Sequence, residues 1–203
     1  MKPPNRRTKA KILRPYAMEM AGIIIAWNSL HETLARLFCA ALGTDNPSVP
    51  LAVWHSLKSD RTQRDALRAA LNQGFLTTKN CLAVREKTKL LLNEIHKLAD
   101  RRNDAIHSPF VLRTDQYGTV FTPDDTFANP RAQKLSANEL LSELVWYREQ
   151  IEHLDNFAFD LYWASAFPRL GWPLPDKLHM TTRKPKSSGS SPQRPNKSDS
   201  VSA

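Results

Sequence analysis

Apolar residues that recur every three to four positions constrain the fold of this chain more than any other feature. The pattern runs through residues 16–42, 82–108 and 136–167, and each segment is long enough for several helical turns. A helix with one apolar stripe must bury that stripe against other elements. The sequence therefore predicts an all-α protein, an up-and-down helical bundle of four to five helices. The first stripe consists of Tyr16, Met20, Ile23, Trp27, Leu30, Leu34, Leu37, Phe38 and Ala41.

Shorter elements are expected between these segments. Gly43 ends the first helix, and a short helix follows from about Val49 to Lys58. Ser59 and Asp60 can cap the next helix, which runs to about Gly74. Residues 110–114 and 119–121 flank a turn and predict the two strands of a small β-hairpin insertion. We expect loop for the rest of residues 109–135. A capping box of Ser136 and Glu139 is expected to start the last helix.

Two basic tails enclose a single domain. Residues 1–14 carry six Lys/Arg and no acid, and residues 168–203 carry seven Lys/Arg and two Asp. Because the net charge of the chain is +9, residues 15–167 carry −2. We expect a helical domain over residues 15–167, with a hairpin and loop insertion at 109–135, between two disordered tails. Such tails add salt-dependent affinity for RNA or DNA, or serve only to keep the protein soluble.

Neither a membrane nor a metal is indicated. The apolar run from Ala21 to Trp27 is too short to span a bilayer. Cys39 and Cys81 lack metal-site spacing, so two reduced thiols in a cytoplasmic protein are the simplest interpretation. No His-Glu-x-x-His zinc motif and no glycine-rich phosphate loop is present. We therefore expect no cofactor.

The segment from Asp100 to Pro109 makes the most definite chemical suggestion. It reads DRRNDAIHSP and closes the third long helix, because proline disfavours helical backbone at the residue before it. Arg102 lies in the middle of that helix's apolar face, where an unpaired charge would be costly. His107 lies in the last turn, where the free carbonyls favour a cation.

Arg102 and His107 together predict a site of phosphate chemistry. Histidine suits proton transfer near neutral pH, and arginine stabilises charge on phosphorus. Five residues apart, they project about 140° apart around the helix, and both line one cleft only if the helix borders it. The alternatives are a buried ion pair for Arg102 and a helix C-terminal cap for His107. Arg148 and His153 repeat the spacing without the asparagine, and we expect them to be solvated.

The pattern resembles a known family. An Arg-Asn-x-x-x-His element on a late helix of a small bundle is similar to that of the HEPN superfamily (higher eukaryotes and prokaryotes nucleotide-binding). The first helix is similar to that of uncharacterised bacterial members, and the resemblance covers roughly residues 16–165. The residues that carry it are Arg102, Asn103 and His107, together with Trp27, Leu30, His31, Glu32 and Leu34.

The resemblance implies a fold, an activity and partners. Such proteins are helical bundles that form homodimers, with two copies of the motif across a shared cleft. Many are metal-independent endoribonucleases, often toxins or phage-defence components, so the implied partners are RNA, a second copy, and an antitoxin or a nucleotidyltransferase-type protein. His107 would be the general acid and base, Arg102 would stabilise the pentavalent phosphate, and Asn103 would orient His107 or the phosphate.

The chain departs from the family in its first helix. Members commonly carry an acid there, and His31 occupies the position nearest that pattern. Glu32 is rotated off the apolar stripe, and Glu19 lies nearer its edge, so the acid that pairs with Arg102 stays open. We count His31, Glu32 and Asp100 as supporting residues.

Further arginines are candidates for RNA contacts. Arg61, Arg64 and Arg101 could reach phosphates, although surface pairing with Asp60 or Asp65 is the simpler interpretation for the first two. The competing function is a non-catalytic interaction or nucleic-acid-binding module of the same fold. A DNA-binding regulator is disfavoured, because the sequence shows no clear helix-turn-helix and the expected domain is slightly acidic.

Overall fold

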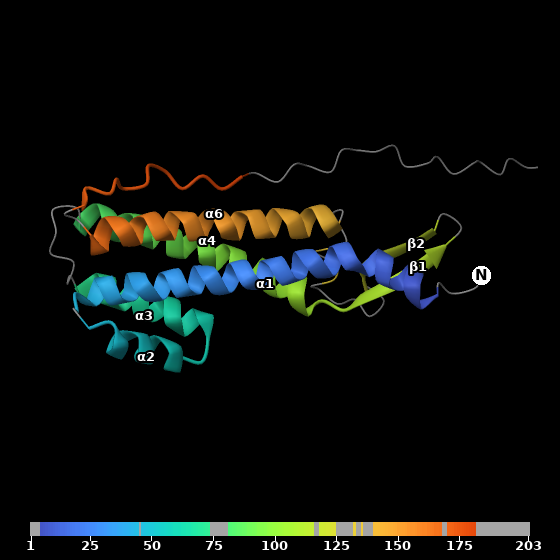
Figure 1. The fold of residues 1–203 in the computed structure, drawn as a ribbon, viewed down its shortest axis with the longest axis horizontal. Coiled ribbons are helices and arrows are strands. Elements are labelled where there is room, and N and C mark those ends of the chain that lie inside the picture. Colours follow the sequence, from blue (N-terminus) through green and yellow to red (C-terminus); the bar gives the residue numbers. More distant parts are fainter. Residues whose placement is uncertain are drawn as a thin grey trace, which may run out of the picture.

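The computed structural model describes residues 5–44, 46–73, 81–115, 118–124, 132, 135, 140–167 and 170–181. Within them, three long helices run side by side (Figure 1). These helices are α1 (Arg6–Leu42), α4 (Cys81–His107) and α6 (Leu140–Ala166). The prediction of an all-α bundle with a small hairpin is confirmed. The proposed capping box of Ser136 and Glu139 lies outside the described residues.

Two shorter helices lie along the C-terminal half of α1 (Figure 1). They are α2 (Ser48–Ser56) and α3 (Asp60–Gln73), close to the predicted ranges. α1 ends where the sequence predicted: Gly43 has a φ of 61°, and its N–H donates to the Ala40 carbonyl at 3.1 Å. Glycine adopts this left-handed conformation at no steric cost, which explains the stop.

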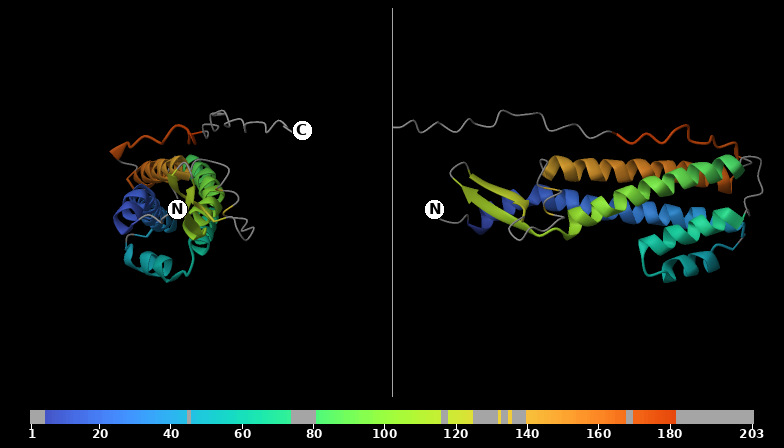
Figure 2. Two further views of the ribbon diagram at one scale, coloured as in Figure 1. Left: turned by 90° about the vertical axis from the view of Figure 1, so that its right-hand side faces the viewer. Right: turned by 180° about the vertical axis from the view of Figure 1, so that it is seen from behind.

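The hairpin extends the bundle at the opposite end (Figures 1 and 2). β1 (Phe110–Asp115) and β2 (Gly118–Pro123) are antiparallel, with Leu112 opposite Phe121. The Phe121 ring stacks on Phe110, with ring centroids 5.1 Å apart, and meets Tyr16 of α1 at 4.9 Å. These ring contacts attach the hairpin to the N-terminal part of α1. Ala132 and Leu135, placed in a loop by the sequence analysis, are instead buried and helical.

The N-terminal boundary predicted from the sequence was wrong. Residues 1–14 were expected to be disordered, but α1 begins at Arg6 and continues through Pro15. Asn5 caps the helix, because its side-chain oxygen accepts the Thr8 N–H at 2.9 Å. A proline inside a helix removes one hydrogen bond, which is why it was read as a boundary. Packing of Tyr16 against the hairpin and core favours the continued helix.

The C-terminal boundary was also wrong for residues 170–181, which were expected to be part of a disordered tail. This segment has no regular structure but runs along α6 (Figure 1). Three of its side chains pack against the core: Leu174, Leu178 and Met180. The Trp146 indole N–H donates to the Thr181 carbonyl at 3.2 Å, and the Thr181 N–H donates to Gln150 at 2.9 Å.

The core lies mainly between α1 and α6. Ile23, Leu30 and Leu34 of α1 are fully buried, as are Leu144 and Ile151 of α6. Burying each such side chain contributes about 1.5–3 kcal/mol, so this seam holds the bundle together. None of the helices in the described part of the chain combines the length and apolarity that crossing a bilayer requires.

Candidate functional site

α4 directs the two key side chains of the Arg-Asn-x-x-x-His element in different directions. Arg102 is half-buried and faces α1, whereas His107 is exposed in the last turn. α4 stops there because Pro109 disfavours helical backbone at Ser108. The Ser108 hydroxyl and N–H both donate to the Asp104 carbonyl in the last turn, at 2.5 and 3.2 Å. This agrees with the predicted divergence around the helix. A single copy therefore does not present the two groups on one side of α4.

Arg102 is held without a carboxylate. Its guanidinium carbon lies 5.2 Å from the centroid of the Trp27 ring, a cation–π contact. Its Nη1 donates to Asn103 Oδ1 at 2.8 Å, and its buried Nε has no partner among the described residues. The buried ion pair considered from the sequence is thus not present in the described part of the protein. Asn103 positions Arg102, whereas the resemblance implied that it orients His107 or phosphate.

Trp27 is fixed in turn by α3. Its indole N–H donates to Asp60 Oδ2 at 2.7 Å, and its ring is 2% exposed. Asp60, Trp27 and Arg102 therefore form one chain of contacts across three helices, α3, α1 and α4. Trp27 was expected only in the core, and its contact with Arg102 was not predicted. Its position in the stripe of the first helix gave no sign of that contact.

His31 lies one turn after Trp27 and is also buried. Its Nδ1 lies 2.9 Å from Gln63 Oε1, while Gln63 Nε2 donates to the Trp54 carbonyl. Because Gln63 Oε1 can only accept, Nδ1 is the donor, which leaves Nε2 of the neutral ring as a buried acceptor without a partner in the described part of the chain. Burial lowers the pKa of His31, and although Asp60 and Gln63 act in the opposite sense, the positive charges of Arg64 and Arg102 also lower it. A neutral His31 is the consequence.

Arg64 does not lie where the sequence analysis placed it. It was expected on the surface, within reach of RNA, but it is 6% exposed, so that expectation was wrong. Its Nη1 is buried and has no partner among the residues that the structure describes, and burial lowers the pKa of Arg64 despite nearby Asp60 and Asp65. The amphipathic pattern of α3 turns Arg64 inward on the same side as Leu67 and Leu71. Arg61 is exposed and lies 4.0 Å from Asp65.

The acids considered from the sequence do not pair with Arg102. Glu19 binds Arg148 at 2.8 Å, and Glu32 is exposed, 3.9 Å from His55. Asp100 is exposed on α4. Arg101 is exposed and lies over the Trp146 ring, with its guanidinium carbon 5.7 Å from the ring centroid.

Arg148 and His153 repeat the spacing of Arg102 and His107, but Arg148 has different surroundings from Arg102. Arg148 is half-buried rather than solvated, and it binds Glu19 and Glu152, each at 2.8 Å. These bonds raise its pKa above the usual range for arginine. Its side chain also lies against Gly22, where an added Cβ would come within 2.7 Å of it. The positive charge of Arg148 is therefore balanced by two carboxylates, and Arg148 links α1 to α6, whereas Arg102 has no carboxylate partner among the described residues.

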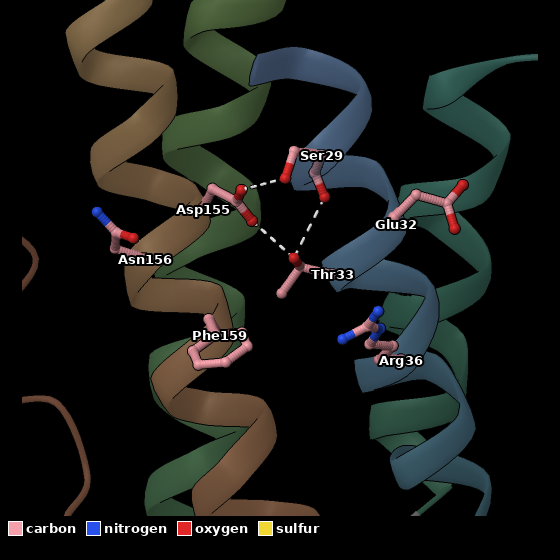
Figure 3. Close-up of a pocket in the computed structure, with 7 residues that line it drawn as sticks. All are labelled: Ser29, Glu32, Thr33, Arg36, Asp155, Asn156 and Phe159. Atoms are coloured by element: carbon pink, nitrogen blue, oxygen red, sulfur yellow. Dashed lines mark hydrogen bonds between the residues drawn. The ribbon is translucent and has the colours of Figure 1, made fainter. Parts of the chain in front are cut away.

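A shallow pocket of about 300 Å³ lies on another face, between α1 and α6 (Figure 3). Asp155 accepts hydrogen bonds from Ser29 and Thr33 there, both at 2.6 Å, and so ties the two helices together. The lining includes none of Arg102, Asn103 and His107; it consists of Ser29, Glu32, Thr33, Arg36, Asp155, Asn156 and Phe159. This pocket belongs to helix packing rather than to the candidate site.

Across the ranges that the structure describes, no group of three or more His, Cys, Asp or Glu side chains has the geometry of a metal site. No family model matches the chain, and neither curated proteins nor solved structures give a match. Function must therefore be inferred from the site itself.

Proposed function

We propose that this protein is a metal-independent endoribonuclease whose site is built from Arg102, Asn103 and His107. The observation that carries the proposal is the state of Arg102. Its guanidinium is oriented by an aromatic ring and an amide oxygen, and no carboxylate of the described residues neutralises it. A fixed and uncompensated cation suits the negative charge that develops on phosphorus during phosphoryl transfer. A purely structural arginine in this position would be expected to pair with an acid.

The chemistry needs one base, one acid and one cation. A neutral His107 takes the proton of a ribose 2′-hydroxyl, and the 2′-oxygen then forms a bond to phosphorus. The bond from phosphorus to the 5′-oxygen breaks, and that oxygen takes a proton from a second, protonated imidazole. The products are a 2′,3′-cyclic phosphate and a free 5′-hydroxyl. Arg102 stabilises the pentavalent phosphate, and Asn103 keeps Arg102 in place.

A second copy of the chain supplies the missing half of the site. Arg102 and His107 diverge on α4, so each copy offers His107 at its surface and Arg102 towards its own Trp27. A homodimer that brings two α4 ends together would join both kinds of group and would provide the two imidazoles. Arg61 and Arg101, both exposed, are proposed to contact the rest of the RNA. An antitoxin or a nucleotidyltransferase-type protein in the cytoplasm is the proposed regulator.

The test is cleavage of unstructured RNA in EDTA by wild type, Arg102→Met and His107→Ala. His153→Ala is the matched control, because His153 has the same spacing from an arginine and is exposed. We expect cleavage by wild type and His153→Ala, with cyclic-phosphate ends, and a loss of about 100-fold or more in the other two. Circular dichroism establishes that all four proteins are folded. Equal cleavage by wild type and His107→Ala would refute the proposal.

A non-catalytic nucleic-acid-binding module is the second candidate. One observation favours it: Arg102 faces Trp27 of α1 while His107 is exposed, so a single copy does not bring the two groups together. This candidate predicts RNA binding by wild type without any cleavage. Wild-type cleavage that falls when excess His107→Ala is added supports the composite site, since a mixed dimer lacks one of the two imidazoles, whereas a binding module shows no cleavage to lower.

A further inference from the structure

The first nine residues of α1 form a basic helical arm, which we define as residues 6–14. It carries five cationic side chains, and the chain has no acidic residue before Glu19. All five are exposed, and none forms an ion pair with another described residue. The five are Arg6, Arg7, Lys9, Lys11 and Arg14. The arm is therefore a concentrated positive charge on an ordered scaffold.

Three of these cations lie in a row. Arg7, Lys11 and Arg14 are spaced by four and three residues, which places them on one face of the helix. At 1.5 Å of rise per residue, the row is about 10 Å long. A row of this kind matches a ligand that carries negative charges at regular intervals. A single small anion could contact only part of the row.

The other side of α1 in this region packs on the protein. Ile12 and Leu13 are half-buried, and the Tyr16 ring contacts Phe121 of the hairpin. A helix that binds a bilayer surface must insert its apolar face, and here that face is already occupied. The arm therefore favours a polyanion in water over a lipid surface.

The arm and His107 lie at the same end of the bundle. His107 ends α4, and three residues later the Phe110 ring stacks on Phe121, which in turn contacts Tyr16 of α1. Figure 1 shows the end of α4, the hairpin and the N-terminal part of α1 together, and Figure 2 shows the same from behind. A strand held by the arm would therefore lie at the end of the bundle where α4 ends.

We propose that the basic arm binds the phosphate backbone of single-stranded RNA and places the strand beside His107. The inference rests on the proposed function for its substrate, and it adds a binding element outside the Arg-Asn-x-x-x-His segment. Cations that neutralise phosphates release counterions, so this binding weakens steeply with salt. For single strands the slope of log K against log salt is about −0.7 per phosphate neutralised.

The test measures binding of a fluorescent oligouridine by fluorescence anisotropy over a range of salt concentrations. All proteins carry His107→Ala so that the RNA stays intact. The arm variant is Arg7→Gln, Lys11→Gln and Arg14→Gln, since glutamine keeps helix propensity. The matched control replaces three exposed cations outside the arm and has the same net charge: Arg36→Gln, Lys58→Gln and Lys177→Gln. Circular dichroism checks the fold of each.

The arm variant should bind about tenfold or more weakly at low salt, and its salt slope should be smaller by about 2, which corresponds to three lost phosphate contacts. The control should change neither quantity noticeably. Equal losses in both variants would overturn the inference, because general charge would then explain binding. RNA binding unaffected in the arm variant, with arm-dependent binding to phosphatidylserine vesicles, would overturn it in favour of a lipid surface.

Binding and cleavage fail separately in this design. Arm-dependent RNA binding together with no cleavage by the wild-type protein supports the arm and contradicts the proposed nuclease. Cleavage by wild type together with arm-independent binding supports the proposed nuclease and contradicts the role of the arm.

Discussion

The guanidinium carbon of Arg102 lies 5.2 Å from the centroid of the Trp27 ring, and the Trp27 indole N–H is bound to Asp60. The ring attracts the cation but, unlike a carboxylate, carries no net charge. Arg102 is therefore positioned and remains positive. Its environment contrasts with that of Arg148, which has two carboxylate partners and links helices.

Two substitutions of Trp27 should separate the contribution of its ring from that of its indole N–H. Trp27→Phe keeps an aromatic face for Arg102 but leaves Asp60 without its donor, which should lower the free energy of unfolding by about 1–3 kcal/mol. Trp27→Leu loses both contacts and should lower stability and cleavage further. Urea unfolding and RNA cleavage measure the series. Trp172→Phe, at an exposed tryptophan, is the control; a Trp27→Leu enzyme as active as Trp27→Phe would contradict a role of the ring.

Replacing Asn103 should uncouple stability from activity. Asn103→Asp keeps an acceptor for Arg102 but adds the carboxylate that the site lacks, so the free energy of unfolding should rise by up to about 1 kcal/mol while cleavage falls. Asn103→Ala should lower both quantities, because Arg102 loses its hydrogen bond. Thermal or urea unfolding with parallel cleavage assays checks this. If Asn103→Asp cleaves RNA as fast as wild type, the charge of Arg102 is not what the chemistry needs.

The buried His31 should make stability depend on pH. Its pKa is lowered in the folded protein from the ordinary value of 6.5, so below about pH 6.5 the unfolded chain binds a proton that the folded protein excludes. Acid therefore favours unfolding, with a slope of up to about 1.4 kcal/mol per pH unit from this group. His31→Gln should flatten the dependence measured by urea unfolding between about pH 5 and 8. His55→Gln, at an exposed histidine, should leave it unchanged; the same slope in wild type and His31→Gln would show that His31 is not its source.

The pocket between α1 and α6 should prove structural. Asp155→Ala removes the hydrogen bonds from Ser29 and Thr33 and should lower the free energy of unfolding by about 2–3 kcal/mol. Cleavage by the folded variant should stay close to that of wild type, because Arg102 lies on the other side of α1. Glu149→Ala, at an exposed acid of the same helix, is the control for stability. A strong loss of cleavage at full folding would instead place this pocket in the active site.

More of the fold than of the candidate site could be predicted from the sequence. Stripes of apolar residues, Gly43 and Pro109 located most helix ends, because these signals act locally. Pro15 led to the wrong N-terminal boundary. Packing of α1 on the hairpin stabilises the helix by more than the loss of the one hydrogen bond that proline removes. The packing of residues 170–181 on the core was not predicted, because the side chains that make it, Leu174, Leu178 and Met180, lie in a Pro-containing segment without a periodic apolar pattern.

Within the site, the apolar-face position of Arg102 and the exposed end position of His107 followed from helical spacing. Their partners did not. The contacts of Trp27 with Asp60, and of His31 with Gln63, join α1 to α3 and depend on how the two helices are turned towards each other. Arg64 shows the same limit, since charge alone suggested a surface position and only the packing of α3 turned it inward.

Rescue of the His107→Ala protein by free imidazole would show that His107 itself transfers protons in the cleavage reaction. If His107 transfers protons during cleavage, imidazole in solution should restore a concentration-dependent part of the rate in EDTA, and should do so only for this variant. Arg102→Met should show no rescue, because its loss removes charge stabilisation rather than a proton acceptor. No rescue at any imidazole concentration, in a folded His107→Ala protein that still binds RNA, would contradict the role assigned to His107.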